Sequence, residues 1–213
     1  MTEIFLPLPD VPGGLPAILT LPNSAKGVII FAHGSGSSRH SPRNRAIAKA
    51  LQARGFATVL FDLLIPEEAD DRANVFDIDL LGRRVSGAID CIKARQDMQS
   101  LPLGLFGAST GAAAALSAAA NDPTSVDAVV SRGGRPDLAK EKLARVRCPT
   151  LLIVGGADHD VVRLNRDALD RLTCRKSLRL VPGATHLFVE AGAMEAVAEL
   201  AGAWFTETLG PQG

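Results

Sequence analysis

The stretch Leu103-Gly-Leu-Phe-Gly-Ala-Ser-Thr-Gly-Ala-Ala-Ala-Ala-Leu116 decides the fold of this chain. A short apolar segment leads into a glycine-flanked serine and then an alanine-rich segment, which predicts a buried strand, an abrupt turn and a helix. Ser109 stands at the apex, in the pattern Gly107-x-Ser109-x-Gly111. The two glycines remove Cβ atoms that would collide in so tight a turn. The first N–H groups of the helix should then point at the serine, where an oxyanion would develop.

Apolar and amphipathic segments alternate on both sides of this turn. Runs typical of strands buried on both faces lie at 27–32, 57–62, 126–131, 150–154 and 177–181. Segments with helical spacing or helix-start residues lie at 41–54, 76–95, 137–145, 161–172 and 190–208. Strands that alternate with helices predict a mostly parallel sheet covered by helices on both faces. We therefore expect one α/β domain over residues 1–213.

Two segments depart from this alternation. Residues 1–24 combine strand-like composition with Pro and Gly turns, which indicates an antiparallel hairpin at an edge of the sheet. Residues 63–74 are acidic and irregular, and we expect a surface loop or a short helix there. Only this acidic segment and one helix separate the strand at 57–62 from the Ser109 strand, so no substantial lid is expected. An open, shallow site favours small substrates over long-chain lipids.

Charge and cysteine content exclude several classes of protein. Lys plus Arg and Asp plus Glu are equal at 23 each, so no global charge favours nucleic acid or a membrane surface. The N-terminus lacks the basic and apolar regions of a signal peptide, and no apolar run is long enough to span a membrane. Three widely spaced cysteines argue against a disulfide framework. We expect a cytoplasmic protein.

A serine nucleophile needs a base within hydrogen-bond reach and a third group that holds the base. His186 follows the last predicted strand, so it should lie at the same edge of the sheet as Ser109. The acid should follow the preceding strand, where Gly155-Gly-Ala-Asp-His-Asp160 stands. Asp158 and Asp160 are both candidates. Asp158 is preferred because it comes directly after the Gly-Gly turn, whereas Asp160 is expected to cap the following helix.

An oxyanion formed at Ser109 needs two hydrogen-bond donors. The backbone N–H of Thr110, directly after the nucleophile, is expected to be one of them. The other should come from the loop after the strand at 27–32, which reads His33-Gly-Ser-Gly36. Glycines in this loop permit close approach of the backbone to a substrate, and we expect the Ser35 N–H to be the second donor.

No metal or cofactor is expected. Asp158, His159 and Asp160 are adjacent on one turn and cannot readily converge on one ion. The Gly/Ser loop lacks the G-x-x-x-x-G-K-[ST] pattern, and Arg39 stands where G-x-G-x-x-G requires its last glycine. A nucleotide phosphate site is therefore not predicted.

Three arginines are expected near the mouth of the site. Arg39 follows the Gly/Ser loop, and Arg132 and Arg135 follow the strand at 126–131. Arg39 or Arg132 could hold an anionic group of a substrate by a bidentate contact. The alternative is an internal ion pair with Asp62 or with the acidic residues 67–71.

At these residues the chain resembles the α/β-hydrolase superfamily, and in particular its dienelactone-hydrolase-like branch. The resemblance covers essentially the whole chain and is carried by His33-Gly-Ser-Gly36, Gly107-Ala-Ser-Thr-Gly111, Gly155-Gly-Ala-Asp-His159 and Gly183-Ala-Thr-His186. It implies a sheet of about eight strands and ester hydrolysis through an acyl-enzyme. The segments 31–44 and 130–137 look like a bacterial subgroup whose members occur alone or fused to a phosphoribosyltransferase domain. An association with such a domain is therefore an expectation.

One departure from the family pattern limits what the resemblance implies. Dienelactone hydrolases proper use a cysteine nucleophile, whereas this chain has Ser109, so lactone specificity is not carried over. The leading hypothesis is a serine hydrolase of small carboxylic esters, with Ser109, His186 and Asp158 as the triad. The alternatives are a non-catalytic or weakly catalytic partner of a phosphoribosyltransferase, and an acyltransferase that uses the same triad.

Overall fold

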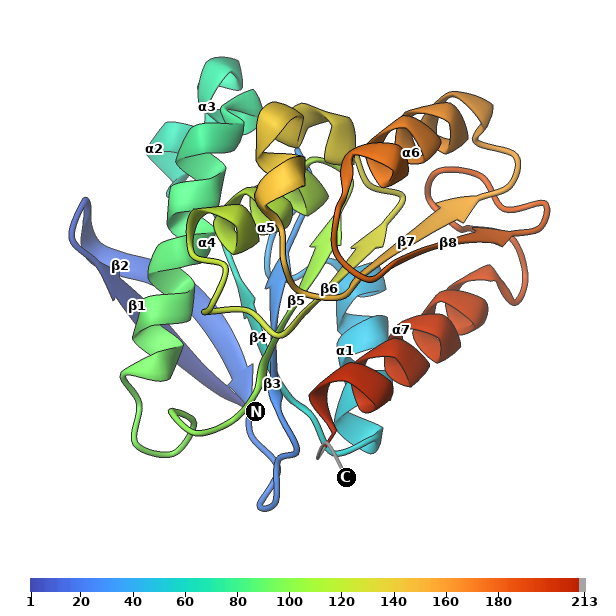
Figure 1. The fold of residues 1–213 in the computed structure, drawn as a ribbon. Helices are drawn as coiled ribbons and strands as arrows, with labels where there is room; N and C mark the ends of the chain where they lie inside the picture. Colours follow the sequence, from blue (N-terminus) through green and yellow to red (C-terminus); the bar gives the residue numbers. More distant parts are fainter. Residues whose placement is uncertain (211–213) are drawn as a thin grey trace.

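The computed structural model describes residues 1–210. They contain one eight-stranded sheet, whose strands lie in the order β1-β2-β4-β3-β5-β6-β7-β8 (Figure 1). The strands are β1 (Thr2–Leu8), β2 (Val11–Thr20), β3 (Val28–Ala32), β4 (Ala57–Phe61), β5 (Leu103–Ala108), β6 (Ala128–Arg132), β7 (Thr150–Gly155) and β8 (Lys176–Val181). β1 pairs antiparallel with β2, and β2 antiparallel with β4, while every other pairing is parallel. The predicted edge hairpin and mostly parallel sheet are both confirmed.

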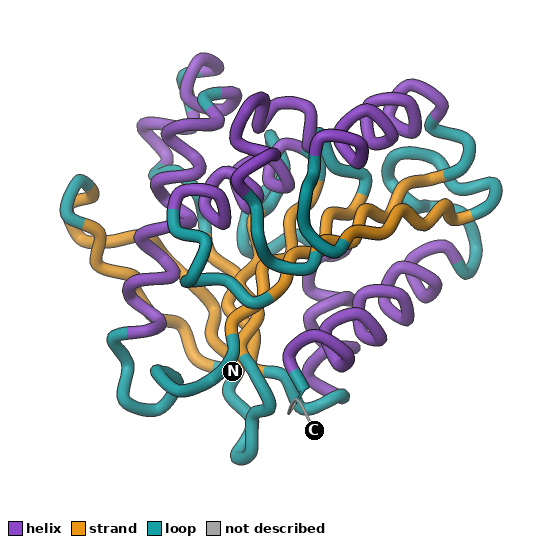
Figure 2. Tube along the Cα trace, viewed as in Figure 1, coloured by secondary structure: helices purple, strands orange, loops and turns teal. Residues whose placement is uncertain are grey.

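Helices cover both faces of this sheet, and Figure 2 shows the strands as a twisted layer between them. One face carries α1 (Pro42–Ala53) and α7 (Ala193–Leu209). The other carries α4 (Ile78–Lys93), α5 (Thr110–Asn121), the 3₁₀ segment η1 (Pro136–Arg145) and α6 (His159–Arg171). One large apolar core lies on each side of the sheet, and a smaller cluster of Val154, Val161 and Val162 packs beside them. The central strands β3, β4, β5 and β6 are buried along their whole length, as their unbroken apolar runs predict.

The helix α5 explains the alanine run after Ser109. All of its residues from Thr110 to Ala120 are buried, because it lies between β5 and its neighbours α4 and η1. Alanine side chains let a helix approach the sheet closely at little cost in side-chain entropy. The serine at its start is therefore held on the most deeply packed helix of the fold.

The structure refines three local expectations. The acidic segment, expected as a surface loop or a short helix, forms two short helices, α2 (Pro66–Ala69) and α3 (Arg72–Phe76). The short helix expected at 137–145 is a 3₁₀ segment interrupted at Lys140, whose φ is 51°. Helix α6 begins at His159, two residues earlier than predicted, so its N-cap position is Asp158 and not Asp160. The predicted capping role of Asp160 is therefore wrong.

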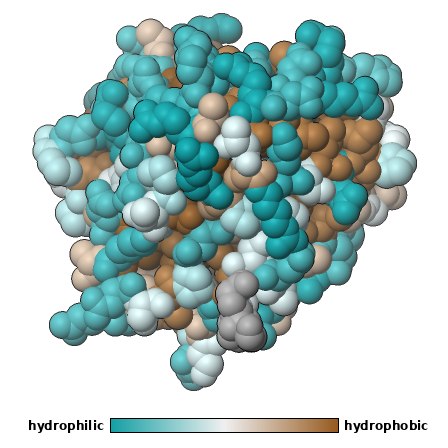
Figure 3. Space-filling model, viewed as in Figure 1, coloured by the Kyte–Doolittle hydropathy of each residue, from teal (hydrophilic) through white to brown (hydrophobic). Residues whose placement is uncertain are grey.

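The face shown in Figure 3 is mostly hydrophilic, with hydrophobic side chains gathered toward the right of the view, the side on which β8 lies. Within the described residues, no helix is long and apolar enough to cross a membrane.

Candidate active site

Ser109 lies in the turn between β5 and α5 with a left-handed backbone, φ 51° and ψ −123°. A positive φ in a residue with a Cβ is costly and persists only where packing enforces it. The flanking glycines supply that packing. A Cβ on Gly107 would lie 2.4 Å from Ala112 Cα, and one on Gly111 would lie 2.3 Å from the Ala32 carbonyl oxygen. The two glycines of the motif are therefore required by close backbone approach.

The loops after β7 and β8 are tied together at the same edge of the sheet. Ala157 N–H donates to the Ala184 carbonyl at 2.9 Å, and Gly156 N–H donates to the Val181 carbonyl at 2.8 Å. A Cβ on Gly155 would lie 2.4 Å from the Ala184 carbonyl oxygen, so this glycine too permits a backbone contact. These contacts place the residues that follow Gly156 beside those that follow Ala184.

Asp158 and His186 are brought together by this contact between loops. Asp158 Oδ2 lies 2.8 Å from His186 Nδ1. The Asp158 side chain is 17% exposed and that of His186 is 40% exposed, so the imidazole remains open to solvent on one side. Asp160 is exposed in the first turn of α6 and forms no bond to His186. Of the two candidate acids, the structure pairs Asp158 with the histidine.

Ser109 and His186 line one cavity of about 250 Å³, together with Ser35, Arg43 and Arg132. Within residues 1–210, no hydrogen bond joins the Ser109 hydroxyl to the His186 ring. Such contacts are often long in ligand-free enzymes and tighten when substrate binds. The remaining nitrogen, His186 Nε2, is the one left for a reacting group, because Nδ1 is held by Asp158.

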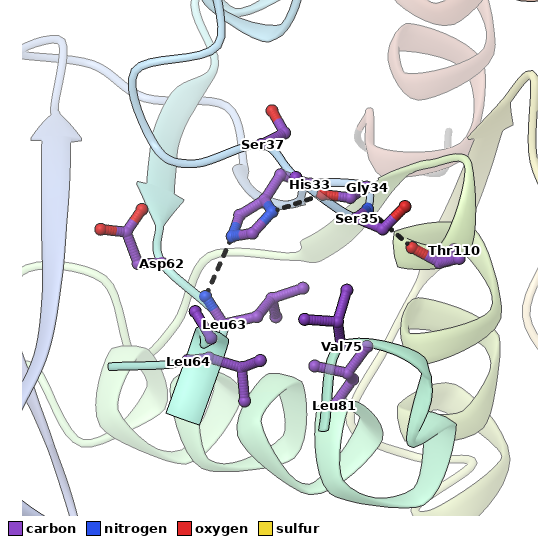
Figure 4. A pocket seen from close by; sticks show the side chains of 12 residues that line it. His33, Gly34, Ser35, Ser37, Asp62, Leu63, Leu64, Val75, Leu81 and Thr110 are labelled. Atoms are coloured by element: carbon purple, nitrogen blue, oxygen red, sulfur yellow. Dashed lines mark hydrogen bonds between the residues drawn. The ribbon is translucent and has the colours of Figure 1, made fainter. Parts of the chain in front are cut away.

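The loop that was expected to supply an oxyanion donor lies directly against the serine. A Cβ on Gly34 would lie 2.9 Å from Ser109 Cβ. Ser35 N–H, the expected second donor, donates to the Thr110 hydroxyl at 2.9 Å (Figure 4). Thr110 is the first residue of α5, so its own N–H is not used by the helix. The N–H groups of Ser35 and Thr110 are therefore adjacent here. The Ser35 N–H is bonded to an uncharged acceptor, the Thr110 hydroxyl.

His33 holds this loop in place, a role that the sequence did not suggest. Its Nδ1 contacts the Gly34 carbonyl at 2.9 Å, and its Nε2 accepts from the Leu63 N–H at 3.1 Å (Figure 4). These partners require a neutral ring with the proton on Nδ1. Burial lowers the pKa of His33 below its usual 6.5, which favours that neutral form.

The three arginines expected near the mouth differ in their partners. Arg39 forms an ion pair with Asp62 through its guanidinium and also donates its backbone N–H to the same carboxylate at 2.6 Å. Arg135 pairs with Asp137 through two hydrogen bonds of 2.9 and 2.8 Å. Arg132 alone of the three has no carboxylate partner within residues 1–210, and it lines the Ser109 cavity.

Two further features of the site were missed from the sequence. Arg43, in the first turn of α1, lines the Ser109 cavity beside Arg132. A positive charge is unfavourable next to the positive end of a helix dipole. This unfavourable placement of Arg43 was the feature of the sequence that could have pointed to a functional role. The second feature is an apolar pocket behind the Ser35–Thr110 contact, formed by side chains that are distant in sequence (Figure 4).

In the part of the chain that the structure describes, no group of three or more His, Cys, Asp or Glu residues could hold an ion.

The strand order, together with a left-handed serine between β5 and α5, defines an α/β-hydrolase. Residues 15–210 match the family model described as dienelactone hydrolase family. The chain belongs to that family.

Two kinds of relative support the assignment. A crystal structure described as dienelactone hydrolase from Anabaena variabilis is 51% identical, with a TM-score of 0.93 and 97% of each chain covered. A Mycobacterium tuberculosis protein named "Putative phosphoribosyl transferase" is 56% identical over 198 residues. That match covers 92% of this chain but 45% of the relative, so the chain spans less than half of the relative's length. Est1E from Butyrivibrio proteoclasticus, at 15% identity and a TM-score of 0.82, shares the fold.

Proposed function

We propose that the protein is a serine hydrolase that cleaves small carboxylic esters through an acyl-enzyme. His186 Nε2 takes the Ser109 proton as the hydroxyl oxygen bonds to the ester carbonyl carbon, and then gives that proton to the departing alcohol. A water molecule attacks the acyl-enzyme, loses its proton to His186 and releases the acid, and the proton returns to Ser109. Asp158 holds the imidazole in the required tautomer.

The observation that carries this proposal is the hydrogen-bonded Asp158–His186 pair. His186 lines the same cavity as Ser109, whose backbone has a positive φ. A positive φ at the half-buried Ser109 costs free energy, and here three separate loops converge on that residue. Membership of the dienelactone hydrolase family supports hydrolysis as the reaction class.

The oxyanion would be held by the N–H groups of Thr110 and Ser35. The Thr110 hydroxyl accepts from Ser35 in the resting site, but a negatively charged oxygen is a stronger acceptor than a hydroxyl. Ser35 N–H would therefore turn to the oxyanion or be shared with it.

An anionic substrate group would be held by Arg132 rather than Arg39. Arg132 lines the cavity without a carboxylate partner, whereas the Arg39 guanidinium is engaged by Asp62. The substrate proposed is thus a small ester with a negative charge, and the site of action is proposed to be the cytoplasm.

The test is hydrolysis of p-nitrophenyl butyrate by the wild type and by Ser109→Ala. Loss of the nucleophile should lower kcat by about 10⁶, as for other triads. A fluorophosphonate should label the wild type and leave Ser109→Ala unlabelled. Ser100→Ala is the control, because Ser100 is exposed near the amino end of β5, away from the cavity. Full activity in Ser109→Ala would refute the proposal.

A second candidate function follows from the length of the Mycobacterium tuberculosis relative. Its name describes a phosphoribosyl transferase, and this chain matches only part of it. The alternative function is that of a non-catalytic or weakly catalytic partner of a phosphoribosyltransferase. This alternative predicts no fluorophosphonate labelling and a stable complex in gel filtration with such an enzyme, which separates it from the leading proposal.

A further inference from the structure

Two cavities of opposite character meet at the nucleophile. The first, the arginine pocket, contains Ser109, His186, Arg43 and Arg132. The second, the leucine pocket, is walled mainly by Leu63, Leu64, Ala69, Val75 and Leu81, and its lining also includes His33 and Asp62, which is paired with Arg39. Both are bordered by the loop Gly34, Ser35 and Ser37, and the consecutive residues Ser109 and Thr110 line one pocket each. A bond attacked by Ser109 would therefore lie at the boundary between them.

The arginine pocket carries positive charge that the protein leaves uncompensated. Arg132 is 6% exposed and donates to Asn44 Oδ1 at 3.3 Å, with its guanidinium 5.8 Å from the centre of the Phe188 ring. Its buried Nε has no hydrogen-bond partner. Burial, together with the charge of Arg43, lowers the pKa of Arg132 to about 10, so the guanidinium is still charged at neutral pH.

Arg43 adds a second unpaired cation. Its Nε is also buried without a partner, and it forms no salt bridge with a carboxylate of residues 1–210. It lies in the first turn of α1, where the helix dipole is positive as well. Two neighbouring guanidiniums and a helix N-terminus repel one another, and a bound anion would offset that repulsion.

The leucine pocket has the opposite chemistry and a limited size. Figure 4 shows Leu63, Leu64, Val75 and Leu81 below the Ser35–Thr110 hydrogen bond. Its volume is about 140 Å³. An apolar cavity of about 150 Å³ in another protein stays dry and binds benzene. The leucine pocket can thus hold a branched chain or ring of roughly six carbons by the same measure.

The position of His186 decides which part of an ester enters each pocket. The imidazolium must give its proton to the leaving oxygen, so the alcohol part has to lie on the His186 side of the scissile bond. His186 lines the arginine pocket and not the leucine pocket. The acyl group then extends the other way, past Thr110 toward the leucines.

We infer that the substrate is an ester of a short apolar acid with an alcohol that carries a carboxylate or a phosphate. The anion is held by Arg43 and Arg132 and leaves with the alcohol, whereas the apolar acyl group stays on Ser109 until water releases it. This inference rests on the proposed serine hydrolase function and adds the orientation of the substrate.

A set of matched esters tests that orientation through kcat/KM. Butyryloxyacetate has its charge on the alcohol side, butyryloxyacetamide is its neutral analogue, and monoethyl succinate has its charge on the acyl side. We expect butyryloxyacetate to exceed both of the others by about tenfold or more, since a hydrogen bond to a charged group contributes that much. A similar rate for 2-(butyryloxy)ethyl phosphate would identify phosphate as an accepted anion, and a much lower one would restrict the site to carboxylates.

Variants assign the selectivity to each pocket. Arg43→Gln should lower kcat/KM on butyryloxyacetate about tenfold more than it lowers kcat/KM on butyryloxyacetamide. Arg45→Gln is its control, because Arg45 is exposed on the same helix outside this pocket. Val75→Phe should reduce activity on butyryl and benzoyl esters relative to acetyl esters. Phe76→Trp, on the outer side of α3, should not.

Two results would overturn the inference. One is equal rates on butyryloxyacetate and its amide, and the other is a preference for monoethyl succinate. Either could occur while Ser109-dependent hydrolysis of p-nitrophenyl butyrate persists, and the proposed function would then stand without the inferred orientation. Loss of Ser109 dependence would instead refute the function itself.

Discussion

Asp158 occupies the N-cap position of α6, yet its carboxylate bonds to His186 Nδ1 at 2.8 Å and not to the backbone of its own helix. A side-chain cap is typically worth about 1 kcal/mol, so the helix gives up this stabilisation. An aspartate directed away from its helix and toward a histidine on another loop is what an orienting acid requires.

This relationship predicts different effects at two neighbouring aspartates. Asp158→Asn should lower kcat on p-nitrophenyl butyrate by about 10⁴, because an amide stabilises the wrong tautomer of the imidazole. Asp160→Asn should change kcat less than about threefold, since Asp160 is exposed and does not contact His186. The reverse ranking would assign the acid to Asp160. Because Asp158 makes no side-chain cap, Asp158→Asn should leave the thermal unfolding midpoint nearly unchanged.

The Ser35–Thr110 hydrogen bond gives a second prediction. Thr110→Val removes the hydroxyl acceptor with little change in shape, and the Ser35 N–H no longer has to leave that hydroxyl to reach an oxyanion. A neutral hydrogen bond contributes about 0.5–1.5 kcal/mol, so kcat should stay the same or rise up to about tenfold. A fall of more than tenfold would mean that the hydroxyl positions the loop. Thr110→Ser, which keeps the hydroxyl, is the control.

The turn around Ser109 predicts a large stability difference between two glycine substitutions. Gly111→Ala places a Cβ 2.3 Å from the Ala32 carbonyl oxygen, and the free energy of unfolding should fall by at least about 3 kcal/mol. In Gly192→Ala the new Cβ has open space around it, and only the positive φ is unfavourable. The free energy of unfolding should therefore fall by about 1 to 2 kcal/mol. Urea unfolding of both variants measures the comparison. Equal losses would show that the Gly111 site relaxes easily.

The buried His33 predicts a pH dependence of stability. Its folded-state pKa lies below the unfolded value of 6.5, so the unfolded chain binds more protons at this site between the two pKa values. Stability should therefore fall as the pH drops below 6.5, by up to about 1.4 kcal/mol for each unit of pKa difference. Urea unfolding at pH 7.5 and 5.5 should show a smaller pH effect for His33→Gln than for the wild type. The same pH effect in both proteins would contradict this account.

The alternation of apolar strands and helices predicted the α/β fold because buried parallel strands need unbroken apolar runs and crossover helices. The same regularity located Ser109, Asp158 and His186 at one edge of the sheet. Boundaries were less predictable: α6 begins at His159, shortly after Gly156 and Ala157, whose N–H groups bond to the β8 loop in a contact that the sequence does not display.

The sequence by itself determined the strand–turn–helix around Ser109, since local glycines and alanines leave few other conformations. It also placed three reactive residue types after three strands, because strand ends are a local property. Only the tertiary structure decided which arginines are paired. Arg39 forms an ion pair with Asp62, which follows another strand, whereas Arg43 and Arg132 pair with no carboxylate in residues 1–210. It alone formed the leucine pocket too, because Leu63 and Leu81 become neighbours only when the chain folds. Charge pairing and cavity shape depend on long-range contacts, which local sequence patterns do not encode.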